Sequence, residues 1–112
     1  MTHYLAELYS PTPAWQALPL EERQAFFARI GAGMGGLAEL GIEALALGRT
    51  DPATPKAPPQ QFFAIWRAPD AAAMAALVSG IAASGWHAYF DTVNASGQGG
   101  DLGAHLAELA AL

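Results

Sequence analysis

The clearest structural pattern in the sequence lies in residues 62–97, FFAIWRAPDAAAMAALVSGIAASGWHAYFDTVNASG. Aromatic and β-branched side chains predict a strand over Gln61–Arg67. Pro69 ends this strand, and Asp70 is of the residue type that caps the start of a helix. The apolar residues that follow at helical spacing are Met74, Leu77, Val78 and Ile81. The segment therefore predicts a strand that leads directly into a helix with one apolar stripe.

The end of the same segment predicts a further strand and a last helix. Gly85 can terminate the preceding helix, a short turn then covers Trp86–Tyr89, and a strand follows over Phe90–Ala95. The glycine-rich residues 96–100, SGQGG, predict a flexible link. Asp101 can cap the last helix, whose apolar side carries Leu102, Leu106 and Leu109.

The N-terminal half predicts the same kinds of element in a different arrangement. In chain order they are a strand over His3–Ser10, a short helical turn around Trp15, a helix from Pro19 to Gly41 and a strand over Ile42–Arg49. The Pro-rich residues 50–60 predict a loop, because proline suits neither a helix interior nor a central strand. In the first strand, alternation places His3, Leu5, Glu7 and Tyr9 on one face.

The order strand, helix, strand, strand, helix, strand is typical of a ferredoxin-like α+β domain. We therefore expect a single domain over residues 1–112, with a four-stranded antiparallel sheet and an added C-terminal helix. No internal repeat and no second domain are indicated.

On these elements, and on residues 62–97 in particular, the chain resembles the dimeric α+β barrel superfamily. That superfamily includes stress-responsive A/B-barrel, EthD-like and YCII-related proteins and antibiotic-biosynthesis monooxygenases. The segment GWHAYFDTVNASG, residues 85–97, also resembles an uncharacterised bacterial subfamily. The resemblance implies a homodimer in which two sheets pack face to face, with a small apolar ligand held between sheet and helices or inside the barrel.

The stretch GAGMGG, residues 31–36, matches the letters of a dinucleotide-binding loop, and Asp51 follows at a suitable distance. Such a loop must lie between a strand and the start of a helix. Here it follows PLEERQAFFARI, which has the pattern of a helix already under way, so we expect the glycines late in that helix. Gly31 and Gly35 then share a face, and we expect them to let the helix approach the sheet or a partner closely.

The composition limits the partners of the protein. Hydrophobic residues make up 53% of the chain and charged residues only 13%, which favours apolar surface covered by a second copy. The net charge of −5, with five scattered basic residues, argues against nucleic acid and membranes as partners. The chain has no cysteine, no span of transmembrane length and no signal-peptide pattern, so we expect a cytoplasmic protein without thiol chemistry.

Glu7 is the first candidate for chemistry, because a carboxylate on a central strand must be paired, exposed or functional. If its face looks into a cavity, burial would raise its pKa, and Glu7 could act as a general base. The more ordinary alternatives are an ion pair with an arginine and contact with solvent at the barrel edge.

The histidines and aromatic residues give further candidates. His3, His87 and His105 have no metal-ligand spacing, so no metal site and no cofactor are expected. Some superfamily members bind haem through a histidine, which keeps His87 as a second catalytic candidate. The expected ligand-binding residues are Phe62, Trp66, Trp86, Tyr89 and Asn94. Ordinary core or dimer packing is the alternative role of these aromatic side chains.

Two functions remain open from the sequence. The first is a cofactor-free enzyme or binder that acts on a small apolar metabolite. The second is a non-catalytic dimerisation or ligand-sensing module.

Overall fold

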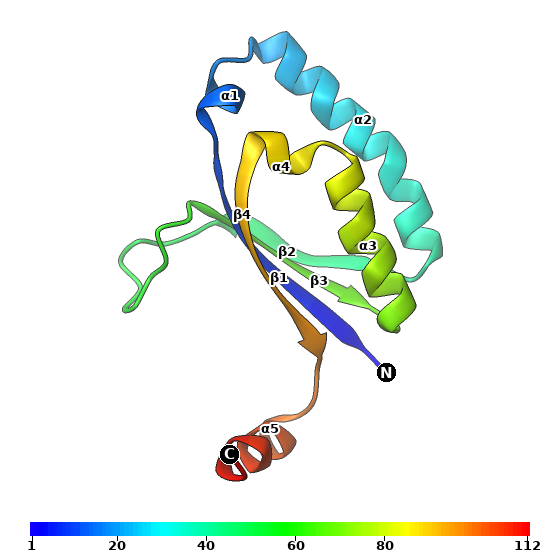
Figure 1. Ribbon diagram of the computed structural model, residues 1–112, viewed down its shortest axis with the longest axis vertical. Coiled ribbons are helices and arrows are strands. Elements are labelled where there is room, and N and C mark those ends of the chain that lie inside the picture. Colours follow the sequence, from blue (N-terminus) through cyan, green and yellow to red (C-terminus); the bar gives the residue numbers. More distant parts are fainter.

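A computed structural model describes residues 1–112 (Figure 1). Its elements are β1 (His3–Pro11), α1 (Pro13–Gln16), α2 (Leu20–Glu39), β2 (Glu43–Arg49), β3 (Phe62–Ala68), α3 (Ala71–Ala83), α4 (Trp86–Tyr89), β4 (Phe90–Gln98) and α5 (Leu102–Ala110). None of these helices combines the length and the apolar character that crossing a bilayer requires.

The four strands form one antiparallel sheet in the order β2-β3-β1-β4. This order and the helix positions confirm the predicted ferredoxin-like α+β fold. Strand β1 is central, and the register sets Glu7 opposite Ala64 on β3 and Asn94 on β4. Residues that are far apart in sequence therefore meet on one face of the sheet.

Helices α2 and α3 lie on the same side of the sheet (Figure 1). Strand alternation turns Leu5, Glu7 and Tyr9 toward these helices and leaves Tyr4, Ala6 and Leu8 on the opposite face. No helix covers that opposite face, which we call the open face. The sheet therefore has one covered and one uncovered side.

The predicted helix ends are confirmed by their hydrogen bonds and backbone angles. The Thr12, Asp70 and Asp101 side chains each accept a backbone N–H from the residue three positions on, at 3.3, 2.8 and 2.7 Å. Gly41 and Gly85 adopt positive φ angles of 79° and 86°, which glycine tolerates best. Helix α2 therefore stops at a residue that suits a left-handed turn.

The apolar interior is divided into two clusters. The larger one joins β1, β3 and α3 around the fully buried side chains of Leu5 and Leu77. The smaller one joins α1, α2 and β4 around Trp15, Phe26 and Phe90. Tyr9 packs against both clusters and is the side chain that links them.

Two sequence predictions are corrected by the structure. Strand β4 runs through Gln98, because residues 96–98 pair with β1 instead of forming a flexible link. The glycines of residues 31–36 do lie late in α2, but a Cβ added at Gly31 or Gly35 would have no atom within 4 Å. Close approach of α2 to the sheet at these glycines is therefore wrong, whereas close approach of a partner there stays a prediction.

Helix α5 stands apart from the rest of the chain (Figure 1). Every residue of this helix is exposed, including the predicted apolar side of Leu102, Leu106 and Leu109. Before it, the Tyr4 ring lies over the backbone of Gly99, where an added Cβ would have no room. Tyr4 therefore fixes where the chain leaves β4 on its way to α5.

The glycines of α2 give the first prediction. Gly35→Ala should raise the free energy of unfolding by about 0.5–1 kcal/mol, because alanine costs less backbone entropy in a helix and meets no neighbour. Thermal and urea denaturation measure the change. Gly41→Ala is the matched control and should destabilise the protein, since Gly41 has positive φ and an added Cβ would lie 3.2 Å from Pro69 Cγ. Destabilisation by Gly35→Ala would instead point to a close contact on α2.

Candidate functional site

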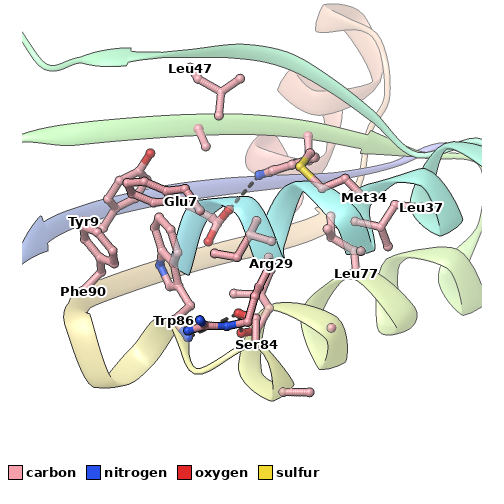
Figure 2. Close-up of a pocket in the computed structure, with 18 of the residues that line it drawn as sticks. Glu7, Tyr9, Arg29, Met34, Leu37, Leu47, Leu77, Ser84, Trp86 and Phe90 are labelled. Carbon is pink, nitrogen blue, oxygen red and sulfur yellow. Dashed lines mark hydrogen bonds between the residues drawn. The ribbon is translucent and has the colours of Figure 1, made fainter. Parts of the chain in front are cut away.

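A cavity of about 820 Å³ lies between the covered face of the sheet and helices α2 and α3 (Figure 2). It takes wall residues from both apolar clusters, and Tyr9, which packs against both of them, is one of its lining residues. Its volume is in the range of ligand-binding pockets in proteins. The cavity exists because α3 packs against the sheet whereas most of α2 does not. Phe26 is the one buried residue of α2, whereas α3 buries Ala73, Met74 and Leu77.

The cavity wall is mainly apolar. Of its 21 lining residues, 15 are hydrophobic, and the others include one carboxylic acid, Glu7, and one cation, Arg29. The aromatic lining residues are Tyr9, Trp15, Phe27, Phe62, Trp66, Trp86 and Phe90. Such a wall favours a ligand with a large apolar or aromatic body and few polar groups.

Glu7 is the only polar residue in the buried interior, with 3% of its surface exposed. Its Oε1 accepts a hydrogen bond from Trp66 Nε1 at 2.7 Å, across the pairing of β1 with β3. Its Oε2 accepts no hydrogen bond from the protein. Because no fully buried side-chain oxygen or nitrogen lacks a partner, Oε2 keeps some accessible surface, which faces the cavity. The second carboxyl oxygen is thus available to a ligand.

The surroundings of Glu7 change its ionisation. Burial raises the pKa of the carboxyl above its ordinary value of 4.5, while the Trp66 hydrogen bond and the charge of His87 lower it in part. Burial also raises the pKa of the neighbouring Tyr9, and the Glu7 charge adds to that effect. Glu7 is therefore placed as a proton acceptor or donor closer to neutral pH than an exposed glutamate.

The two ordinary roles for Glu7 are both wrong. Glu7 is buried, so it does not lie in solvent at the edge of the sheet. It also forms no ion pair, since the single salt bridge of the protein joins Arg67 to Glu43 at the surface. The buried carboxyl consequently has no ion-pair partner in the chain, and only the more distant charge of His87 acts on it.

The other arginines have different contacts. Arg23 donates to backbone carbonyls of Gln16 and Leu18 at the end of α1. Arg49 stands over the Phe62 ring at 5.2 Å, and Arg29 over the Phe26 ring at 5.6 Å. Arg29 is exposed at the rim of the cavity. None of these guanidinium groups forms an ion pair with Glu7.

The structure brings four of the seven predicted site residues to the cavity. These are Glu7, Phe62, Trp66 and Trp86. Trp86 is held in place by donation from its Nε1 to Thr92 Oγ1 at 3.2 Å and by stacking on Phe90, with ring centroids 4.1 Å apart. The site therefore joins residues of β1, β3 and α4.

The other three predicted residues do not line the cavity. His87 is exposed on α4. Tyr89 packs between Trp15 and Phe26, with ring centroids at 5.5 and 5.1 Å. Asn94 pairs with Glu7 in the β1–β4 register but is exposed on β4. Their roles as catalytic or ligand-binding residues thus have no support from the geometry of the cavity.

Several lining residues were not predicted from the sequence. Arg29 and Gly33 come from α2, whose side of the cavity could not be placed without knowing how far the helix stands from the sheet. Tyr9 was open to prediction, because it lies two positions after Glu7 on the same strand face. The histidines lie on β1, α4 and α5, and no three side chains of metal-ligand type come together.

The chain is similar to one protein family and to proteins of known structure. The model of a family described as "Family of unknown function (DUF6616)" matches residues 2–112. The chain belongs to the DUF6616 family. No curated protein matches this DUF6616 sequence. Among solved structures, the DUF6616 chain is similar to the crystal structure of a protein named as a candidate chlorite dismutase, with 18% identity and a TM-score of 0.63.

That similarity covers 81% of the DUF6616 chain and 39% of the other chain. The present chain thus spans well under half the length of the protein it matches. At 18% identity the similarity shows a shared fold and does not assign an activity to this chain.

The buried carboxyl gives a prediction on stability and pH. A raised pKa in the folded state means that the folded protein holds this proton more tightly, so stability falls as pH rises above about 4.5 toward the folded pKa. Glu7→Gln cannot ionise and keeps an acceptor for Trp66. The variant should therefore be more stable than the wild type at about pH 7, with a gap that closes toward pH 4.5.

Urea denaturation over this pH range measures both proteins. A wild type that matches or exceeds Glu7→Gln in stability at neutral pH would contradict a burial cost at Glu7. Glu43→Gln serves as the matched control, because Glu43 is exposed and the same change there removes only a surface ion pair.

Proposed function

We propose that this protein binds a small, largely apolar molecule in the cavity and that Glu7 contacts it. The observation that carries the proposal is a buried carboxyl, with one free oxygen, on the wall of a cavity of about 820 Å³. Burying an ionisable group without a charged partner costs stability. A binding or catalytic role gives a reason for keeping it there.

The arrangement supports a cofactor-free enzyme or binder. As a carboxylate, Glu7 could take a proton from a bound molecule, and the apolar wall would exclude water from that step. Tyr9, which also lines the cavity, is a titratable group whose pKa responds to the Glu7 charge. His87, the second catalytic candidate, is exposed and lies outside the lining, so the proposal rests on Glu7 alone.

A non-catalytic sensing or dimerisation module is the second candidate. It is favoured by the exposed helix α5 and by the uncovered face of the sheet, both of which offer apolar surface to another molecule. The first candidate requires a ligand in the cavity, whereas a dimerisation module does not. A measurement of ligand binding therefore distinguishes these two roles.

Binding of a neutral apolar dye tests the proposed cavity. Nile red should bind the wild type with one dye per chain, and Ile81→Trp should weaken this binding at least about tenfold because the indole fills cavity volume. Fluorescence titration gives both affinities. Ala82→Trp is the control, since Ala82 is exposed on the same helix and does not line the cavity. No saturable dye binding to the wild type would contradict the proposal.

We also propose that a second copy of the chain covers the open face of the sheet. The apolar side chains of this face are Tyr4, Ala6, Leu8, Phe63, Ile65, Val93 and Ala95. Val93 is 54% exposed and Tyr4 36% exposed, which is typical of surface that another sheet covers. The resemblance to dimeric α+β barrels supports the same partner.

Ile65→Glu should turn such a dimer into a monomer, because a carboxylate in the middle of the open face would be buried against its own copy. Light scattering after size-exclusion chromatography at micromolar concentration gives the mass. Ala72→Glu, which adds the same charge on the exposed side of α3, should leave the dimer intact. A monomeric wild type would rule out the dimer.

A further inference from the structure

The interior of the cavity has an unbalanced charge distribution. The Glu7 carboxyl is 3% exposed, and its only hydrogen-bond donor is the neutral Trp66 indole. The only cation in the wall, Arg29, stands over the Phe26 ring and is exposed at the rim. A buried carboxylate is ordinarily compensated by a cation. In this chain the nearest compensation comes from His87, which is exposed on α4 outside the cavity wall and lowers the Glu7 pKa only in part. No cation pairs with Glu7 inside the cavity.

Aromatic rings line the cavity beside the Glu7 carboxyl. Figure 2 shows Tyr9, Trp86 and Phe90 gathered on one side of the Glu7 carboxyl. The Tyr9 ring meets the Trp86 ring edge-on, with centroids 5.1 Å apart, and stacks near Phe62 at 6.0 Å. Faces of electron-rich rings attract organic cations, most strongly when water is excluded.

We propose that the molecule bound in this cavity carries a protonated amine, which pairs with the Glu7 carboxylate among these rings. The inference rests on the proposed binding function and names the chemistry of its ligand. The apolar body of that amine would extend toward the part of the cavity lined by Met34, Leu37 and Leu77. Ligand and site together would then bury one negative and one positive charge as a pair.

The proton balance of this step is simple. A neutral amine that enters the cavity takes the proton of the Glu7 carboxylic acid, which gives an ammonium and a carboxylate. If Glu7 is already ionised, a protonated amine binds without any proton transfer. In both cases an N–H of the ammonium donates to Oε2, and Oε1 keeps its bond to Trp66 Nε1.

Alternative ligands fit the charge pattern less well. An alcohol can donate one hydrogen bond to Oε2 but leaves a buried carboxylate without a counter-charge. A carboxylic acid anion would be repelled by Glu7 and could pair only with Arg29 at the rim. These two ligand classes are therefore the right comparison in a test.

Three probes of matched shape test the inference: 2-naphthylmethylamine, 2-naphthalenemethanol and 2-naphthoate. Isothermal titration calorimetry at about pH 7 gives their dissociation constants. The wild type should bind the amine at least about tenfold more tightly than the alcohol, because the ammonium adds to the hydrogen bond a counter-charge for the carboxylate that a hydroxyl lacks. The naphthoate should bind most weakly.

Two variants show whether Glu7 causes the preference. Glu7→Gln should bind the amine and the alcohol with similar affinity, and its binding of the alcohol reports that the cavity is intact. Glu108→Gln, which removes the same charge from the exposed helix α5, should keep the wild-type preference for the amine. The wild-type comparison stands even if Glu7→Gln fails to fold.

Each result against the inference has a distinct meaning. If the wild type binds the alcohol as tightly as the amine, the inference that the ligand is an amine is wrong, but the proposal that the cavity binds a ligand is retained. If the amine preference persists in a folded Glu7→Gln, the cation is held elsewhere and the inference is also wrong. If none of the three probes binds and Nile red fails as well, the inference and the proposed function fall together.

Discussion

The Glu7 carboxyl is buried on the central strand of the sheet with one neutral hydrogen-bond donor, and the site is organised around this constraint. A folded protein must satisfy or compensate such a group, because desolvation favours its neutral form. Trp66 satisfies one oxygen from the adjacent strand β3. The other oxygen faces a cavity large enough for a ligand. The uncompensated charge of Glu7 can therefore be met by a ligand that enters the cavity.

The cavity results from unequal packing of two helices on one sheet. Helix α3 places Met74 and Leu77 in the main apolar cluster, whereas α2 buries only Phe26 near its start. The late part of α2 carries four glycines without close neighbours, so few side chains reach from it toward the sheet. The helix is held mainly at its ends, by the aromatic cluster around Trp15 at one end and by Leu37 at the other.

The sequence was sufficient to predict the element order, because apolar periodicity and capping residues such as Asp70 are local signals. It was insufficient at the end of β4, where pairing with β1 overrides a glycine-rich composition. The placement of Glu7 followed from strand alternation. The positions of His87, Tyr89 and Asn94 could not be predicted, since they depend on how α4 and β4 turn away from the cavity. No local sequence pattern indicates the distance between α2 and the sheet, so the cavity itself could not be predicted.

The ionisation of Glu7 in solution is the decisive test of an uncompensated carboxyl that pairs with a bound amine. Nuclear magnetic resonance of the side-chain carboxyl carbon, followed through a pH titration, measures the pKa of Glu7 in the folded protein. We expect a pKa above the ordinary value of 4.5 in the free protein, and we expect this pKa to fall when 2-naphthylmethylamine is added. A Glu7 carboxyl that titrates at or below 4.5 in the free protein and does not respond to the amine would contradict both expectations.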